Sequence, residues 1–304
     1  MSKKTKVVVT GGAGFIGSHL TKYLVRQGYR VHVIDNLATG SRNKIDPKAK
    51  FYKLDIENLK SIKPVFSGAR FVFHLAALPR VQLSIEDPIK THETNINGTL
   101  NVLIAARDAK VKRVIYSASS SAYGDQKIFS LNENLASKPL SPYGLQKYVG
   151  EHYCRIFSSV YGLETVCLRY FNVYGPGMSE KGNYLPVFVI FLKQRQQDLP
   201  MTIIGDGKQT RSFTYVGDVV RANVLASTSK QAGQGEVINI CGDRAYSINE
   251  ITKMIGGPVI KLPSRAGEIK HSQGDTNLAK KLLSWETKIS LKQGLNELKS
   301  IYKV

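Results

Sequence analysis

The chain has few of the residues that mark secreted, metal-binding or membrane-spanning proteins. It contains only three cysteines among 304 residues, Cys154, Cys167 and Cys241, and no C-x-x-C pair. An odd number of widely spaced cysteines predicts reduced core thiols, and neither a disulfide framework nor a metal site. No apolar run reaches the roughly 20 residues that a spanning helix needs, and the apolar stretch after the N-terminus is too short for a signal peptide. We therefore expect a cytoplasmic protein with no membrane partner.

Acidic residues are also scarce. The 23 Asp and Glu residues stand against 43 Lys and Arg residues, which gives a formal net charge of +20. Such a charge can attract an anionic partner, either a nucleic acid or a nucleotide-linked metabolite. The lysines, however, are scattered and do not alternate with aromatic residues. We favour a solvated surface or the steering of a small anion, and we expect no nucleic-acid partner.

What the chain does have is a repeated alternation of strand and helix patterns. Short apolar runs alternate with helical patterns through about residue 160, at 7–9, 31–34, 51–54, 71–75 and 113–116. This alternation predicts an α/β protein with a Rossmann-type, doubly wound parallel sheet. Beyond about residue 170, glycine-containing loops interrupt the short apolar segments. We expect a dinucleotide-binding domain at 1–170, with 212–243 returning to it, and a smaller α/β substrate lobe at 171–211 and 244–304.

A glycine-rich turn follows the first predicted strand. Gly11, Gly14 and Gly17 have the spacing G-x-x-G-x-x-G between an apolar strand and a helical pattern. There, backbone N–H groups and a helix N-terminus can approach a pyrophosphate without obstruction by side chains. Asp35 ends the next strand, where its carboxylate can accept both ribose hydroxyls and repels a 2′-phosphate, so NAD is favoured over NADP. Asp55 can meet the adenine; the alternative for both aspartates is a helix cap or turn.

A second motif places a phenol and an ammonium on one helix face. Tyr143 and Lys147 are four residues apart, behind Pro142 at a predicted first helical turn. A neighbouring ammonium and a positive nicotinamide favour the phenolate, so we expect the pKa of Tyr143 to fall below its usual value of about 10. Tyr143 would then serve as a general base. A hydroxyl of the cluster Ser117–Ser121 can relay the substrate proton, although such a cluster also suits a polar strand exit.

At this point the chain resembles the extended short-chain dehydrogenase/reductase family, and within it the nucleotide-sugar 4-epimerases. The resemblance covers essentially the whole chain. Its matching segments are Thr10–Gly17, Asp35–Leu37, His74–Ala77, Asn95–Thr99, Ser119–Ser121, Ser141–Gly144, Arg169–Pro176, Gly205–Gly207, Arg211–Val216 and Leu283–Trp285.

The resemblance implies a role for each matching residue. Ser119, Tyr143 and Lys147 match the catalytic residues, and the first two also contact the substrate. The positions that match NAD contacts, besides the glycines, Tyr143 and Lys147, are Phe15, Ile16, Asp35, Asn36, Asp55, Ile56, Ala76 and Asn95. The positions that match contacts to UDP are Asn172, Asn183, Arg211 and Arg265. Arginine suits that place because a guanidinium binds a diphosphate through two hydrogen bonds.

The triplet Ser119-Ser120-Ser121 distinguishes related reactions. Sugar 4,6-dehydratases of this family carry Thr-Asp-Glu there, and decarboxylating relatives carry Thr-Ser-Glu. Here the triplet has no carboxylate, which favours epimerisation. The implied reaction removes the proton of the C4 hydroxyl through Tyr143 while hydride passes to NAD⁺. The keto sugar then turns over within the site, and the hydride returns to its opposite face.

The preferred sugar is left open. Ser272 occupies the position where strict UDP-glucose epimerases of the family carry tyrosine, and a small residue leaves room for an acetamido group. We therefore expect activity on UDP-GlcNAc/UDP-GalNAc, alongside UDP-glucose/UDP-galactose. Two departures from the galactose epimerases are Pro79 in place of a common lysine and a short segment at 251–262. By family analogy we expect a homodimer formed by helices at about 91–107 and 142–160. The alternatives are a related epimerase or reductase and a non-catalytic NAD-binding regulator.

Overall fold

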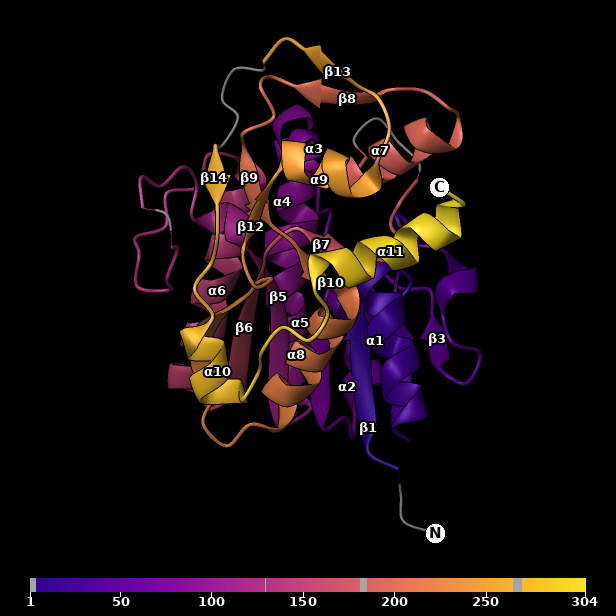
Figure 1. The fold of residues 1–304 in the computed structure, drawn as a ribbon. Helices are drawn as coiled ribbons and strands as arrows, with labels where there is room; N and C mark the ends of the chain where they lie inside the picture. Colours follow the sequence, from indigo (N-terminus) through magenta and orange to yellow (C-terminus); the bar gives the residue numbers. More distant parts are fainter. Residues whose placement is uncertain (1–3, 129, 181–184, 265–269) are drawn as a thin grey trace.

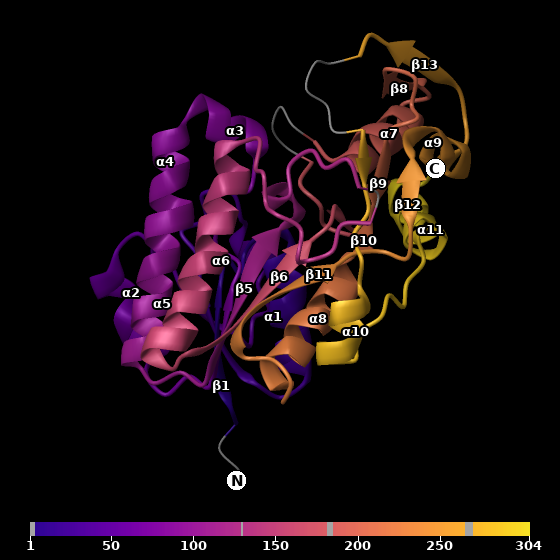
Figure 2. The same ribbon diagram turned by 90° about the vertical axis from the view of Figure 1, so that its left-hand side faces the viewer.

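A parallel sheet of seven strands forms the centre of the protein (Figures 1 and 2). The computed structural model describes residues 4–128, 130–180, 185–264 and 270–304. The strand order is β11-β6-β5-β4-β1-β2-β3, and all six pairings are parallel. The strands are β1 (Lys6–Thr10), β2 (Arg30–Ile34), β3 (Lys50–Tyr52), β4 (Phe71–His74), β5 (Arg113–Ser119), β6 (Glu164–Tyr170) and β11 (Gln234–Ile240). The chain changes direction across the sheet between β1 and β4, so a crevice for a ligand is expected at the carboxyl ends of these strands. The predicted doubly wound parallel sheet is confirmed.

Both faces of the sheet are covered by helices, as the continuous apolar strands predict. Alternate residues of β1 face different layers: Val7 and Val9 belong to one apolar core, and Val8 belongs to another. The first layer consists of α1 (Phe15–Arg26), α8 (Val216–Thr228) and α10 (Asn277–Leu283). The second consists of α2 (Leu59–Phe66), α5 (Gly98–Asp108) and α6 (Pro142–Tyr161), on the opposite face in Figure 2. Two buried layers hold the central strands in place and leave the strand ends to form the site.

A smaller lobe lies above the carboxyl ends of the strands (Figure 1). It has its own apolar core, which includes Phe188, Leu192, Ile251 and Leu295. Its helices are α7 (Val187–Gln196), α9 (Ile248–Ile255) and α11 (Leu291–Tyr302), and its strands are β8 (Met201–Ile204), β9 (Thr210–Ser212), β12 (Ala245–Ser247), β13 (Val259–Leu262) and β14 (His271–Ser272). Strand β9 lies between β12 and β14, and β8 pairs with β13. The short parallel pair β7 (Val173–Tyr174) and β10 (Thr214–Tyr215) stands near the junction with the sheet.

Parts of residues 212–243 and 277–285 pack on the seven-stranded sheet although both stretches lie far beyond residue 170 in sequence. Strand β11 pairs with β6, so the stretch that we expected to return to the sheet contains its last strand. Helix α10 and Trp285 also pack on the sheet, in the core of α1 and α8, although we placed 277–285 in the substrate lobe. The indole N–H of Trp285 donates to the Asp218 carbonyl at 2.9 Å. The predicted lobe is corrected at 277–285, and the other domain limits stay a prediction.

Short helices complete the surroundings of the strand ends. They are η1 (Arg42–Lys44), α3 (Val81–Glu86), α4 (Pro88–His92), the π-helix η2 (Glu93–Asn97) and η3 (Ser120–Ala122). Element η2 leads directly into α5, so the helix expected at about 91–107 contains one wide turn. Such π-turns are frequent at functional sites. None of the helices in the described part of the chain is long and apolar enough to cross a membrane.

Candidate active site

The turn between β1 and α1 can only be made by glycine. Gly11 has φ +72°, and a Cβ there would lie 2.6 Å from the main-chain nitrogen of Ala76. A Cβ at Gly17 would lie 2.1 Å from the carbonyl oxygen of Gly11. Helix α1 begins at Phe15 behind Gly14, which has no side chain to cap the helix. The first-turn N–H groups and the helix dipole therefore form an anion site at the end of β1.

Asp35 connects this turn to the loop after β2. One carboxylate oxygen accepts from the Ala13 N–H at 2.9 Å, and the other accepts from the Leu37 N–H at 2.8 Å. The carboxylate is 9% exposed, and each oxygen keeps acceptor capacity for a ribose hydroxyl. Asp35 therefore shapes a turn, as one of the two interpretations has it. Its binding of a ribose stays a prediction.

The candidate adenine contacts lie one loop further out. Asn36 is exposed, and its amide donates to Asp55 at 2.7 Å, while the other oxygen of Asp55 accepts from the Glu57 N–H at 2.9 Å. Ile56 is 4% exposed and packs against Gly98. Phe15, Ile16 and Ala76 are half-buried at the same edge. NAD fits these residues. The glycine turn leaves no room for a Cβ, the N-terminus of α1 carries no side-chain cap, and the Asp35 carboxylate can accept from a ribose.

The catalytic candidates stand on β5 and α6. Ser119 ends β5, and Ser141 caps α6 by accepting from the Gly144 N–H at 3.1 Å. Pro142 lies in the first turn, as predicted. A Cβ at Gly144 would lie 2.6 Å from the Ser121 carbonyl oxygen, and one at Gly150 would lie 2.2 Å from the Tyr116 hydroxyl. These two close approaches hold α6 tightly against β5, so Ser119 and the face of α6 that carries Tyr143 keep a fixed separation.

Tyr143 is 8% exposed, and the Ser119 side chain is its neighbour. Burial raises the pKa of Tyr143 to about 12, and the nearby Ser119 hydroxyl acts in the opposite direction. The expected lowering is therefore wrong for the protein's own groups. The reason is burial of the phenol. The Lys147 ammonium is directed at the main chain and donates to the Ser117 carbonyl at 2.8 Å.

Lys147 is itself 4% exposed and lies over the Tyr116 ring, 4.9 Å from its centroid. Burial lowers the pKa of Lys147 to about 8, while Cys154 and Glu151 act to raise it. With this pKa the side chain is mostly a charged donor at pH 7. It can hold a ribose hydroxyl and favour the phenolate through its charge once a ligand completes the site.

Ser84 and Gln146, which the sequence did not single out, position this pair together with Asn95. The Ser84 hydroxyl accepts from the Tyr143 N–H at 3.0 Å. Asn95, presented by the π-helix, accepts from the Leu78 N–H at 2.8 Å and donates to Gln146 at 2.7 Å, and Gln146 donates to Thr91 at 3.0 Å. Asn95 is 1% exposed, so in this structure it joins α6 to the strand-end loop. Gln146 is three residues beyond Tyr143, and that helical spacing is the signal that could have revealed it.

His74 is a further buried group beside Lys147. Its ring nitrogens pair with the hydroxyls of Thr10 at 2.8 Å and Thr99 at 2.9 Å. Burial first, and the charge of Lys147 second, lower the pKa of His74 to about 3. The ring stays neutral at physiological pH and ties β4 to β1 and α5.

The substrate candidates come from the small lobe. Ser272 of β14 pairs in register with Arg211 of β9, and both side chains are half-buried. Asn172, at φ +31°, is exposed and donates from its amide to the Ser212 carbonyl at 2.9 Å. The structure thus brings Asn172, Arg211 and Ser272 to one small sheet. Asn183 and Arg265 lie outside the described residues.

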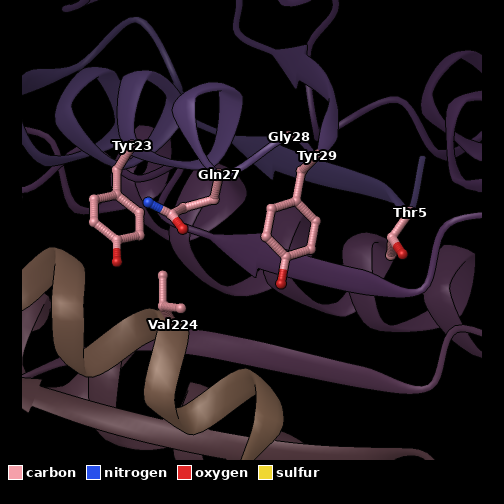
Figure 3. Close-up of a pocket in the computed structure, with 6 residues that line it drawn as sticks. All are labelled: Thr5, Tyr23, Gln27, Gly28, Tyr29 and Val224. Carbon is pink, nitrogen blue, oxygen red and sulfur yellow. The ribbon is translucent and has the colours of Figure 1, made fainter.

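A cavity with a volume of about 260 Å³ lies elsewhere (Figure 3). Tyr23 and Gln27 line it from the carboxyl-terminal end of α1, the end opposite the glycine turn, and Val224 lines it from α8. It contains none of the candidate residues.

Comparisons with known proteins agree with this geometry. Residues 7–241 match the model of the NAD dependent epimerase/dehydratase family. A protein of Methanocaldococcus jannaschii named putative UDP-glucose 4-epimerase is 38% identical over 300 residues, 96% of each chain. UDP-glucuronate 4-epimerase of Thermodesulfobacterium geofontis is 34% identical over 307 residues, 95% of this chain and 93% of the relative.

Two solved structures are similar over almost their whole length. UDP-glucose 4-epimerase of Thermotoga maritima, crystallised with UDP-glucose, shares 38% identity and a TM-score of 0.92, with 98% of each chain covered. UDP-N-acetylglucosamine 4-epimerase of Methanobrevibacter ruminantium, in complex with UDP-N-acetylmuramic acid, shares 33% identity and a TM-score of 0.91, with 98% of this chain and 99% of the other covered. These proteins share one architecture and differ in the sugar that their names give.

Proposed function

The chain belongs to the NAD dependent epimerase/dehydratase family, whose cofactor is NAD, and we propose that it epimerises a UDP-hexose at C4. The observation that carries the proposal is the proximity of the Ser119 hydroxyl and the Tyr143 phenol at the carboxyl edge of the sheet, beside Lys147. The relatives named above support the reaction class, since both curated proteins are named 4-epimerases.

The residues divide the work by their chemistry. Tyr143 takes the proton of the C4 hydroxyl and returns it after the keto sugar has turned over, and Ser119 bridges the reacting oxygen and the phenol. NAD, held by the glycine turn after β1 and by Asp35, would supply the acceptor and donor of the C4 hydride. The Lys147 ammonium would donate to the ribose and favour the phenolate. Binding of the UDP group, remote from C4, holds the substrate while the sugar is free to rotate.

Elimination and decarboxylation need an additional acid or base. The triplet after β5 offers only the hydroxyls of Ser119, Ser120 and Ser121, and Ser119 and Ser121 already bond to each other at 3.1 Å. Hydroxyls without a neighbouring carboxylate are poor acids and bases near neutral pH. This supports epimerisation over the other reactions of the family.

For the substrate we propose UDP-GlcNAc/UDP-GalNAc together with UDP-glucose/UDP-galactose. Arg211, Arg265, Asn172 and Asn183 are the proposed contacts to UDP. Ser272 is the proposed wall beside C2, and its position next to Arg211 in the sheet supports a place in the same pocket. A serine leaves the volume that an acetamido group needs.

The test supplies the purified protein and NAD⁺ with UDP-glucose, UDP-GlcNAc or UDP-glucuronate in separate reactions. We expect galacto-configured product by proton NMR from the first two, and no signal of a 6-methyl group. The Tyr143→Phe variant is the blank. If the protein binds NAD and epimerises none of the three, the proposal fails, and a reductase or an NAD-binding regulator becomes the better hypothesis.

We also propose that the protein is a homodimer in the cytoplasm, formed through α6 and its neighbours. Helix α6 exposes apolar side chains that no described residue covers: Leu145 is 50%, Ile156 48% and Val160 67% exposed. Ile89 of the adjacent α4 is 76% exposed. Exposed apolar side chains on two neighbouring helices support association with a second copy. Light scattering is expected to give twice the chain mass, and Val160→Lys is expected to give the single-chain mass.

A further inference from the structure

Two side chains from the NAD side of the molecule hold neighbouring carbonyls of the loop after β7. The His19 ring pairs through Nε2 with the Pro176 carbonyl at 2.8 Å, and the Lys44 ammonium donates to the Gly177 carbonyl at 3.0 Å. A carbonyl only accepts, so the His19 Nε2 is the donor. His19 belongs to α1, whereas Lys44 ends η1. We call this pair of bonds the 176–177 latch.

The segment that carries Lys44 is fixed against the glycine turn. The Ser41 N–H donates to the Ala13 carbonyl at 3.0 Å. A Cβ at Gly40 would lie 2.8 Å from atoms of Ala13, so the segment passes Ala13 at main-chain distance. Asp35 binds the N–H of the same Ala13. The loop after β2 is therefore a fixed wall beside the pyrophosphate-binding turn.

The loop that is held lies along the first turns of α1. Gly175 and Gly177 have φ +147° and +81°, which lets the chain bend sharply there. A Cβ at Gly177 would lie 3.9 Å from the His19 Nε2. Phe15, at the start of α1, packs against the core of the small lobe. The glycine turn, the loop after β2 and the loop after β7 thus come together at one helix N-terminus.

We propose that His19 and Lys44 close a ring of main chain around the pyrophosphate of bound NAD and thereby set the rate at which the cofactor leaves. The inference rests on the cofactor position proposed above. Both latch residues are positioning residues, because they act through the loop at 175–177. The Lys44 bond is charge-assisted, and opening the ring breaks it together with the bond from His19. A 4-epimerase regenerates NAD in each cycle, so slow release is useful to it.

The experiment measures release of NADH, which is fluorescent, when the loaded protein is mixed with excess NAD⁺ in a stopped-flow instrument. Lys44→Met removes the donor and is expected to speed release about 3- to 10-fold, in the range of a single exposed charge-assisted hydrogen bond. Lys44→Arg keeps a charged donor and should release NADH at the wild-type rate. His19→Leu should accelerate release in the same way as Lys44→Met.

Lys48→Met is the control for net charge, because it removes an equally charged lysine just beyond η1; Lys48 is exposed, whereas Lys44 is half-buried. We expect Lys48→Met to behave as wild type in release rate. The proposal is overturned if Lys44→Met releases NADH at the wild-type rate. It is also overturned if Lys48→Met speeds release as much as Lys44→Met does, because the effect would then come from net charge alone. Thermal unfolding of each variant checks the fold. If the wild-type protein binds no NADH at all, the proposed position of the cofactor is refuted. This outcome differs from fast release of bound NADH, which would refute the latch alone.

Discussion

In the cofactor half of the site, Gly11 and Gly17 stand where any Cβ would collide with main chain, and Asp35 is held by two N–H groups. In the substrate half, Arg211 and Ser272 stand on strands of three and two residues, and both side chains are half-buried. The first half is fixed by backbone geometry that few sequences can reproduce. The second is a set of side chains on short strands of a small three-stranded sheet.

This difference separates what is common to a family from what varies within it. A substitution in the cofactor half is expected to impair the reaction with every substrate, because the glycine turn, the helix N-terminus and the proposed ribose contact depend on one another. A substitution on β9 or β14 changes the shape of a pocket without disturbing the seven-stranded sheet. The same division appears among the relatives, which share the architecture at TM-scores of 0.92 and 0.91 and are named for different sugars.

The substitution with the largest expected effect is Tyr143→Phe, which tests the part of the site that all substrates share. Loss of the phenolic proton relay should lower kcat about 1,000-fold, within the usual range for a general acid–base group. The loss should be the same for every UDP-sugar that the enzyme accepts, because the phenol acts at C4 in each of them. Steady-state rates measured with two sugars check this. A loss confined to one sugar would show that Tyr143 selects substrates, which would remove the division between the halves.

Gly17→Ala tests whether the turn tolerates any side chain. Its Cβ would lie 2.1 Å from the Gly11 carbonyl oxygen, so the turn must open, at a cost of about 3 kcal/mol in the free energy of unfolding and with loss of NAD binding. Gly14→Ala is the matched control, because its Cβ would lie 3.2 Å from the same oxygen. Denaturant unfolding and NAD content should rank wild type first, Gly14→Ala second and Gly17→Ala last. Equal behaviour of the two variants would contradict this account of the turn.

The sequence predicted the cofactor half better than the substrate half for the same physical reason. The glycine spacing and the apolar strands left few alternatives, and the parallel sheet and the NAD-dependent family are both confirmed. The role of Ser84 depends on packing between α3 and α6, and no local pattern reports such a contact. The helical spacing of Gln146 from Tyr143 is a local signal, but its bonds to Asn95 and Thr91 depend on tertiary packing. We expected Trp285 in the lobe because it lies late in the chain. In the structure it packs in the apolar core between the sheet and α1 and α8, and its distance along the chain does not report that contact.

The pKa of Tyr143 could not be predicted from spacing alone. The interval of four residues places Lys147 on the correct face, but the direction in which its ammonium points is decided by the Ser117 carbonyl on β5. Burial then dominates and raises the pKa of the phenol. Local periodicity fixes which residues are neighbours, whereas the charge state of a neighbour depends on tertiary contacts.

The titration of Tyr143 can sharpen the comparison further. In the protein without cofactor, its pKa of about 12 keeps the phenol protonated throughout the physiological range. Binding of NAD⁺ adds a positive charge and should lower that pKa by about two units or more. Because the deprotonated phenol is the base, activity should rise with pH through the lowered value. The difference in phenolate absorbance between wild type and Tyr143→Phe, recorded with and without NAD⁺, measures the shift; equal curves would mean that the cofactor half does not activate the base.

Ser272→Tyr should have the smallest and most selective effect. Tyrosine fills the volume beside the proposed C2 position, so the ratio of kcat/KM for UDP-GlcNAc to that for UDP-glucose should fall about 10-fold or more, in line with what one steric clash in a pocket achieves. The rate with UDP-glucose, NAD content and stability should stay near wild type, because β14 lies outside the seven-stranded sheet. Ser272→Ala, which adds no volume, should leave the ratio unchanged. An equal loss of kcat/KM with both sugars would indicate that Ser272 contacts a group that both substrates share, such as UDP. Ser272 would then belong to the part of the site that is common to all substrates.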